Sequence, residues 1–540
     1  MIEQNLIMRK DLTFLSCAVC LFASVVHGQQ IKPPASCDAL QKIPPAAVLI
    51  LSTEEVAEGT RVNGNGVAMP AHCLVRGEVN KHTGADGKSY GDLFELRMPK
   101  DWNGRLLFQG GGGLDGVVQP AIGASGALDR PAILRGYAVV STDGGHESNP
   151  NAHGIDGSFG SDPGALADYE YRSTQLVTDA AKAILARHYG EGPKHSYFRG
   201  CSNGGREGLM AVQRYPQYFD GVIAGAPAFH LTRAMIAEAW SSMQFAAIAP
   251  KDAQDRPNLA NALSDSDLQL VAHGVLAKCD ELDGVKDELI SNPEACKFDP
   301  AVLRCAGAKT ESCLSEGQVT ALKMAMGGPV DSHGKQLYSN WPYDSGLAGA
   351  GWRAWILGSE TMPSFNTVIF PPAINGMALA GQRPPIDIFH FDFDHDAARL
   401  NKAAAANLNS DATNLAAFRK HGGKLILYTG MSDPVFSAND LIRYYKDVTA
   451  ANGGEKETLG FARLFLLPGV NHCGGGPGLD SFDSLTALEE WVEEGSAPGH
   501  IIAKGNAFPG RTRPLCPYPL TPHYNGWGNP ENAVSFVCHN

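Results

Sequence analysis

The sequence predicts an α/β fold with a parallel sheet and one long insertion. Short apolar runs recur along the chain, each followed by a glycine-rich or polar turn: residues 106–116, 136–146, 195–204, 221–227, 424–437 and 463–476. Such strand-and-turn units are typical of parallel sheets. A long stretch of weak periodicity precedes residue 424, and the 540 residues exceed the usual size of one domain. We therefore expect one large domain with an insertion.

The N-terminus has the pattern of a secretory signal peptide. Arg9 and Lys10 precede an apolar run from Leu12 to Val26, which the small residue Gly28 closes. A membrane anchor is the alternative, but the run is shorter than the about 20 residues that a spanning helix needs. No later segment is long enough to span a membrane. We expect residues 1–28 to be removed and the mature chain to be secreted or periplasmic.

The charge balance disfavours a nucleic-acid partner. The formal net charge is -13, and the chain has no basic run or basic helix that could follow a phosphate backbone. We therefore expect no nucleic-acid binding.

The stretch from residue 195 to residue 219 predicts a strand, a tight turn and a helix. An aromatic run at 195–199 is followed by GCSNG at 200–204, which fits G-x-S-x-G, and by helical spacing over 205–219. In such a turn, glycines permit close packing, and the serine hydroxyl is exposed over the sheet in front of a helix N-terminus. The bare pattern also arises by chance among 61 glycines. The flanking strand and helix favour an α/β-hydrolase fold with Ser202 as nucleophile.

A serine nucleophile needs a base and an acid that orients the base, and this fold supplies them in the chain order Ser, Asp, His. KLILYTGMSDPVFS, residues 424–437, is an apolar run followed by a turn with Asp433. RLFLLPGVNHCGGG, residues 463–476, is another, followed by a loop with His472. Most Asp and His side chains are solvated or packed, but these two follow strands at the edge where open α/β sheets place their sites. We predict the triad Ser202, Asp433 and His472.

Negative charge develops on the substrate carbonyl oxygen during attack, so backbone N–H donors are needed close by. LLFQGGGGLDG, residues 106–116, is a strand followed by a glycine run. We predict Gly113 and Asn203 as the oxyanion donors; a merely flexible turn is the alternative. Asp143 and His146, after the next strand, are interpreted as structural or pocket-lining.

The insertion is expected to be a lid. Residues 229–418 hold three tryptophans between positions 341 and 355 and four cysteines, and a stretch of this length cannot be a loop. The expected organisation is a signal peptide (1–28), a hydrolase domain in two parts (29–228 and 419–540), and a lid domain (229–418) with an acidic loop.

The acidic loop is a candidate calcium site. Between Cys279 and Cys296, three carboxylates at Asp280, Asp283 and Asp287 repel one another unless a cation or solvent separates them. Their spacing is not that of an EF-hand, and a solvated acidic loop is the alternative. We expect structural Ca²⁺.

The cysteines predict disulfide bonds. Cys17 and Cys20 leave with the signal peptide, so ten of twelve cysteines remain, and an even count in an exported chain favours disulfides. The spacing suggests four pairs: Cys37–Cys73, Cys279–Cys296, Cys305–Cys313 and Cys516–Cys538. A bridge between the remaining Cys201 and Cys473 would connect the turn of the nucleophile to the loop of the base; two buried free thiols are the alternative. Lipidation at Cys17 is disfavoured by Phe14.

The residues identified above resemble those of the tannase and feruloyl esterase family, which also includes mono(2-hydroxyethyl) terephthalate hydrolase. The matching segments span nearly the whole mature chain: GCSNGGREG, ILYTGMSD, GFARLFLLPGVNHCGGGPG, CDELDGVKD and RTRPLCPYP. The resemblance implies an α/β-hydrolase with a lid, the triad given above and a Cys201–Cys473 bridge. It also implies structural Ca²⁺ held by side chains and two carbonyls: Asp280, Asp283, Asp287, Val285 and Leu289.

The function that follows is a secreted serine carboxylesterase acting on feruloyl, other hydroxycinnamoyl or galloyl esters through an acyl-enzyme. One alternative is hydrolysis of terephthalate monoesters; another is a non-catalytic protein that binds polyphenols or carbohydrates. A terephthalate monoester carries a carboxylate that favours an Arg or Lys partner, and residues 354–382 contain neither. Apolar residues there that could line a slot are Phe365, Ile369, Phe370 and the two methionines. Neutral acyl groups are therefore favoured, although Arg353 or Arg383 could still reach the site.

Overall fold

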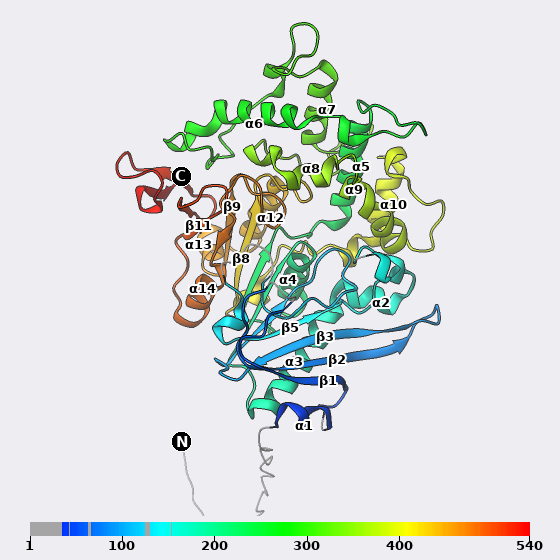
Figure 1. Ribbon diagram of the computed structural model, residues 1–540, viewed down its shortest axis with the longest axis vertical. Coiled ribbons are helices and arrows are strands. Elements are labelled where there is room, and N and C mark those ends of the chain that lie inside the picture. Colours follow the sequence, from blue (N-terminus) through cyan, green and yellow to red (C-terminus); the bar gives the residue numbers. More distant parts are fainter. Residues whose placement is uncertain (1–34, 43, 63–65, 125–129, 153) are drawn as a thin grey trace, which may run out of the picture. The chain divides into compact units, whose positions relative to one another are not determined.

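A nine-stranded sheet forms the centre of the described part of the chain, in the order β1-β2-β3-β5-β4-β6-β7-β8-β9 (Figure 1). The computed structural model describes residues 35–42, 44–62, 66–124, 130–152 and 154–540. The expected signal peptide, residues 1–28, lies outside these residues. Within them, no helix is both long enough and apolar enough to cross a membrane.

The sheet is antiparallel at its N-terminal edge and parallel elsewhere. The antiparallel strands are β1 (Val48–Val56), β2 (His72–Thr83) and β3 (Ser89–Pro99), and β3 pairs antiparallel with β5. The parallel strands are β4 (Arg105–Gln109), β5 (Ala138–Thr142), β6 (His195–Cys201), β7 (Gly221–Gly225), β8 (Lys424–Gly430) and β9 (Ala462–Leu467). All six apolar runs predicted as strands are strands. They are nearly continuous apolar runs because both faces of this part of the sheet are covered.

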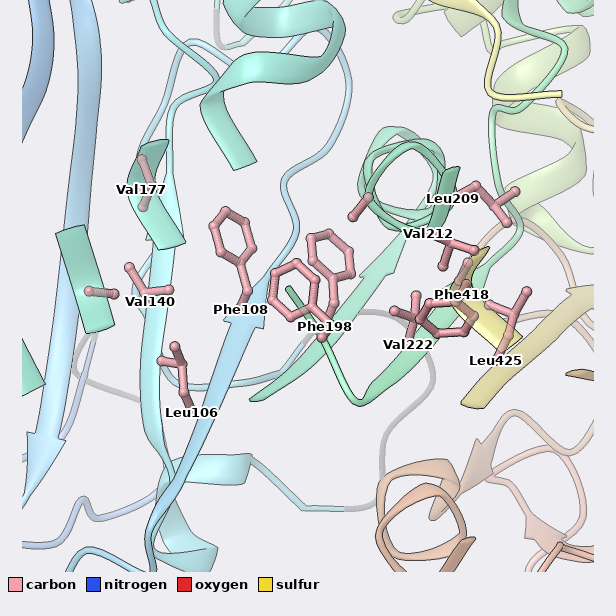
Figure 2. Close-up of a cluster of buried hydrophobic side chains, with 14 of the residues drawn as sticks. Leu106, Phe108, Val140, Val177, Phe198, Leu209, Val212, Val222, Phe418 and Leu425 are labelled. Carbon is pink, nitrogen blue, oxygen red and sulfur yellow. The ribbon is translucent and has the colours of Figure 1, made fainter. Parts of the chain in front are cut away.

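Helices cover both faces of the sheet. On one face lie α3 (Ser173–Tyr189), α4 (Asn203–Arg214) and α12 (Ala438–Ala451), which share a buried apolar cluster with the strands. Figure 2 shows this cluster, in which the rings of Phe108 on β4 and Phe198 on β6 stack 5.2 Å apart. On the other face, α14 (Ser484–Glu489) buries Leu485 and Leu488 against the strands. Shorter helices complete this part of the chain: α1 (Cys37–Lys42), α2 (Pro163–Ala167), α11 (Ala416–His421) and α13 (Glu455–Leu459).

The stretch between β7 and β8 is helical. It contains α5 (Leu231–Ala246), α6 (Asp265–Cys279), α7 (Glu316–Gly327), α8 (Ala350–Ile356), α9 (Phe365–Phe370) and α10 (His395–Leu408) (Figure 1). These helices bury apolar side chains among themselves, in one cluster around Ile236 and Leu400 and in another around Val275 and Trp352. The second cluster consists of residues of the expected insertion alone, whereas the first also includes residues that precede it, such as Leu114 and Phe159.

The last residues add two small antiparallel sheets. One is formed by β10 (Ser481–Phe482), β11 (Ile501–Lys504) and β12 (Arg513–Leu515), and the other by β13 (Thr521–Tyr524) and β14 (Phe536–His539).

Five disulfides connect the described chain: Cys37–Cys73, Cys201–Cys473, Cys279–Cys296, Cys305–Cys313 and Cys516–Cys538. All five pairs are those that the sequence predicted. Four of them close short segments, whereas Cys201–Cys473 spans 272 residues.

Candidate active site

Ser202 occupies the sharp turn between β6 and α4. Its backbone angles are φ 64° and ψ -124°, a conformation that side-chain-bearing residues seldom adopt. The turn requires glycine at its flanks, because a Cβ atom on Gly200 would lie 2.3 Å from the carbonyl oxygen of Gly204. The helix begins directly after the serine and ends at Arg214, five residues before the predicted end, because Pro216 disfavours helical geometry at the residue before it.

The three residues predicted as a triad form one hydrogen-bonded line. The Nε2 atom of His472 lies 2.9 Å from Oγ of Ser202, and its Nδ1 atom lies 2.8 Å from Oδ2 of Asp433. The backbone N–H groups of Val435 and Phe436 donate to the other Asp433 oxygen at 2.8 and 3.0 Å. Asp433 is thereby fixed as an acceptor, which favours the imidazole tautomer protonated at Nδ1. In that tautomer, Nε2 is free to accept the serine proton.

A disulfide joins the two loops that carry this line. Cys201 directly precedes Ser202 and Cys473 directly follows His472, and their Cα atoms lie 6.0 Å apart. The bridge limits how far the hydroxyl and the imidazole can separate.

The helical insertion also holds these loops, through a residue that the sequence did not single out. Asp344 accepts hydrogen bonds from Ser432 Oγ at 2.6 Å and from the N–H of Gly469 at 2.7 Å. Burial raises the pKa of this carboxyl. Nothing in the local sequence marks Asp344, because its partners lie far away along the chain.

The glycine-rich loop after β4 lies beside Ser202. Gly113 has a positive φ of 59°, and Gly113 and Asn203 line the same cavity as the serine. Asn203 is the first residue of α4, where backbone N–H groups have no partner within the helix. Both residues predicted as oxyanion donors are therefore at the site.

A buried polar network ties this loop to α4. The side-chain amide of Asn203 donates to Asp115 at 2.6 Å and to Glu207 at 3.1 Å, and Glu207 accepts the N–H of Gly111 at 3.1 Å. Burial, followed by the nearby Glu207 carboxylate, raises the pKa of Asp115 well above its usual range. Both effects favour the protonated form of the Asp115 carboxyl.

A cavity of about 390 Å³ opens from Ser202 and His472. Apolar side chains form much of its wall: Leu231, Met235, Trp355, Phe365, Ile369 and Ala373. Of the residues suggested for an apolar slot, Phe365 and Ile369 line it, whereas Phe370 is buried in the apolar cluster around Ile236 and Leu400. Among the described residues that line the cavity there is no Lys or Arg.

Glu238 is a cavity-lining residue that the sequence analysis missed. Burial raises its pKa to about 8. The sequence does contain a sign of this residue, because Glu238 is the single acidic residue in the apolar helical run AMIAEAW. The spacing of Leu231, Met235 and Glu238 places all three on one face of a helix.

The acidic loop is tightly structured. Gly284 has φ 91°, and Asp280 Oδ1 accepts the N–H groups of Asp287 and Glu288 at 3.1 and 3.0 Å. Burial and then Asp287 raise the pKa of Asp283 to about 7, and one buried Asp283 oxygen has no hydrogen-bond partner in the described structure. Unpaired buried carboxylate oxygen suits a hard cation. Nowhere in the described ranges, however, does a set of three His, Cys, Asp or Glu side chains converge as a metal site does.

Asp143 and His146 are structural. Asp143 accepts the N–H groups of Leu93 and Gly145, and the ring of His146 stacks on Phe159 with centroids 3.7 Å apart. Burial lowers the pKa of His146 to about 4, so it is neutral.

Comparisons with known proteins agree on one family. Residues 73–539 match the family model described as "Tannase and feruloyl esterase". "Mono(2-hydroxyethyl) terephthalate hydrolase" of Piscinibacter sakaiensis is 41% identical, over 93% of this chain and 91% of that protein. "Probable feruloyl esterase B" of Aspergillus niger is 28% identical, over 93% of this chain and 95% of that protein.

Solved structures show the same fold. Feruloyl esterase B from Aspergillus oryzae superposes with a TM-score of 0.79 at 25% identity, covering 93% of this chain and 99% of its own. Tannin acyl hydrolase from Aspergillus niger gives a TM-score of 0.70 at 21% identity, covering 94% and 93%. At that identity the second likeness concerns the fold alone.

Proposed function

Because the chain belongs to the tannase and feruloyl esterase family, we propose that it is a serine carboxylesterase that hydrolyses esters of aromatic acids. Family membership makes the chain an ester hydrolase. The observation that carries the serine mechanism is the hydrogen-bonded line from Ser202 through His472 to Asp433. A non-catalytic binding protein has no need of this arrangement.

Acylation begins at Ser202. His472 Nε2 removes the hydroxyl proton as Oγ attacks the ester carbonyl carbon, and Asp433 stabilises the imidazolium that forms. The N–H groups of Gly113 and Asn203 stabilise the negative oxygen of the tetrahedral intermediate. Collapse of the intermediate breaks the bond to the alkoxy group, which leaves as an alcohol with the proton from His472. The acyl group remains on Ser202.

Deacylation repeats the chemistry with water. His472 takes a proton from a water molecule that attacks the acyl-enzyme carbonyl, and a second tetrahedral intermediate forms. Its collapse releases the carboxylic acid and returns the proton to Ser202 Oγ. Every proton transfer in this cycle passes through Nε2 of His472, while the hydrogen bond from Nδ1 to Asp433 keeps the ring oriented.

The wall of the cavity supports an aromatic and neutral acyl group. Trp355 and Phe436 pack edge-on against the His472 ring with centroids 5.6 and 5.4 Å away, so flat apolar surface lies next to the reacting atoms. Feruloyl and galloyl groups suit this wall. The relative named mono(2-hydroxyethyl) terephthalate hydrolase supports the second candidate, a terephthalate monoester. Comparing kcat/KM for methyl ferulate, methyl gallate and mono(2-hydroxyethyl) terephthalate decides between them; a tenfold preference for the last, about 1.4 kcal/mol, would contradict our ordering.

Three further features belong to the proposal. Residues 229–418 act as a lid, supported by the contacts of Asp344 and Trp341 with the loop of Asp433.

The acidic loop holds structural Ca²⁺ with the Asp280, Asp283 and Asp287 side chains and the Val285 and Leu289 carbonyls. The buried Asp283 oxygen that has no hydrogen-bond partner in the described structure supports this assignment. The bound cation would supply positive charge that offsets the carboxylate repulsion. Five disulfides support export to an oxidising compartment.

The test is the Ser202→Ala variant. It should lower kcat for p-nitrophenyl acetate and methyl ferulate by roughly 10⁴ to 10⁶. A serine-directed phosphonate should label the unmodified protein and leave the variant unlabelled. Near-normal turnover by the variant would refute the mechanism, and ester binding by the unmodified protein without turnover or labelling would favour the binding protein.

A further inference from the structure

Glu238 is the last of the α5 residues that line the cavity. This part of the lining starts at the nucleophile, where the N–H of Ala228 donates to the carbonyl oxygen of Ser202 at 3.1 Å. It continues along α5, whose Leu231, Met235 and Glu238 line the cavity. Their spacing of four and three residues places them on one helix face. Seven residues of helix rise by about 10 Å, so Glu238 lies that far along the helix from Leu231.

A second part of the cavity lining is aromatic, and its chain contacts α5. The ring of Trp355 lies 5.6 Å from that of His472, and the ring of Phe365 lies 5.2 Å from that of Trp355. The residue after Phe365, Asn366, donates to Ser241 Oγ on α5 at 3.3 Å. Both parts of the lining therefore start next to the reacting atoms, and the contact between them lies three residues from Glu238 along α5.

No described residue pairs with the Glu238 carboxyl. The residue is 8% exposed, and its Oε2 atom is buried without a hydrogen bond in the described structure. The other titratable groups that line the cavity are Tyr169 and His472. Burial alone raises the pKa of Glu238 to about 8, so the group is a neutral acid at pH 7 and can both donate and accept a hydrogen bond. An unpaired polar group in an apolar wall is unfavourable until a ligand pairs with it.

We propose that Glu238 recognises a phenolic hydroxyl at the end of the substrate's acyl group remote from the ester. The proposal rests on the proposed esterase function and makes Glu238 a specificity-determining residue. A phenol suits the site because it can donate to and accept from a neutral carboxyl. A substrate carboxylate would add a buried charge, and no Lys or Arg is among the described lining residues to offset it.

Three esters test the proposal on the unmodified enzyme. Methyl 4-hydroxycinnamate carries the hydroxyl, methyl cinnamate lacks it, and methyl 4-methoxycinnamate has a similar electronic effect on the ester without the donor. We expect kcat/KM for the hydroxylated ester to exceed that for each of the others by about 10- to 100-fold, the usual effect of leaving a buried partner unpaired. Equal values for the three esters would overturn the proposal without any variant.

Variants locate the recognition at Glu238. Glu238→Leu should abolish the preference for the hydroxyl, whereas Glu238→Gln, which still donates and accepts, should retain much of it. Glu170→Gln is the matched control, because Glu170 is also a buried carboxyl with a raised pKa but does not line the cavity. This control should keep the full preference.

The outcomes separate this proposal from the esterase function. A preference that survives in Glu238→Leu, or one lost equally in Glu170→Gln, would overturn the role of Glu238. If p-nitrophenyl acetate hydrolysis depends on Ser202 while the three cinnamates are used equally, only the role of Glu238 fails. If no ester is hydrolysed, the esterase function itself fails.

Discussion

At the residue scale, the ionisation of Glu238 couples stability to pH. Its pKa is 4.5 in the unfolded chain and about 8 in the folded one. The contribution of Glu238 to the free energy of unfolding is fully present below pH 4.5. It is lost as the pH rises towards 8, because the unfolded chain releases the proton at a lower pH than the folded chain does. At pH 7 the free energy of unfolding is therefore lower by about 3 kcal/mol than it would be with a group that does not titrate at this position.

The Glu238→Gln variant should therefore become more stable relative to the unmodified protein as pH rises from 5 to 8. All other titrating groups are common to both proteins, so their effects cancel in the difference. Melting temperatures of the two proteins at pH 5, 6, 7 and 8 measure it. A difference that does not change with pH would show that Glu238 is not a buried neutral acid.

Whether a residue of the site could be predicted from the sequence depends on where its partners lie. Ser202, Asp433 and His472 were predictable because each lies in the turn or loop that follows an apolar strand, so the local sequence contains the signal. Asp344 was missed because its partners Ser432 and Gly469 lie 88 and 125 residues away. The spacing of Leu231, Met235 and Glu238 indicates that they share one face of a helix. The sequence does not show that this face lines the cavity, because that depends on how the insertion packs.

At the element scale, the contact between the glycine-rich loop and α4 should control kcat. Glu207 accepts the N–H of Gly111 and the side-chain amide of Asn203, and so holds together the loop and the helix start that carry the proposed oxyanion donors. Glu207→Ala should lower kcat for p-nitrophenyl acetate by about 10- to 100-fold with a smaller change in KM, because the donors act mainly in the transition state. Glu207→Gln keeps an acceptor for Gly111 and should lose less. Equal losses in the two variants would contradict a positioning role.

The disulfide between the two catalytic loops should also matter for turnover. Replacing both Cys201 and Cys473 with Ala should leave a folded protein with lower kcat, because Ser202 and His472 lose their covalent connection while the other bridges remain. The matched control replaces Cys516 and Cys538, whose bridge connects the residue after β12 to β14. The control should lower the melting temperature and leave kcat nearly unchanged. An unchanged kcat in the first variant would remove the disulfide from the mechanism.

Element boundaries show what the sequence pattern leaves undetermined. The strands were predictable because their apolar runs end at glycine or polar turns. The helix after Ser202 was predicted over 205–219 but extends from Asn203 to Arg214. Apolar spacing continues through Tyr215 and Phe219, so the pattern alone did not reveal that Pro216 ends the helix.

At the scale of the whole molecule, the acidic loop connects the insertion to the C-terminal region. Arg513 on β12 forms an ion pair with Asp287, and Arg511 donates to the Asp287 carbonyl oxygen. Ca²⁺ bound in this loop would therefore stabilise the contact between two distant parts of the chain. It would lie away from the reacting atoms, since none of the loop residues lines the cavity.

Chelation should accordingly lower the melting temperature more than it lowers initial rates. The measurement is a thermal melt and an initial-rate assay with and without a chelator, with added Ca²⁺ as the reversal. Asp283→Asn should have a melting temperature that no longer responds to the chelator. An immediate loss of activity in still-folded protein, fully restored by Ca²⁺, would contradict a structural role.

The Cys201–Cys473 bridge gives the chain a closed covalent path that contains the whole insertion. Suppose that a protease cuts one peptide bond between residues 314 and 472. Of the five disulfides in the described chain, only Cys201–Cys473 spans such a cut. Ser202 would then belong to one fragment and His472 to the other. The disulfide between the neighbouring Cys201 and Cys473 would still join the two fragments covalently. A cleaved enzyme of this kind is a two-chain protein whose chains separate only after reduction.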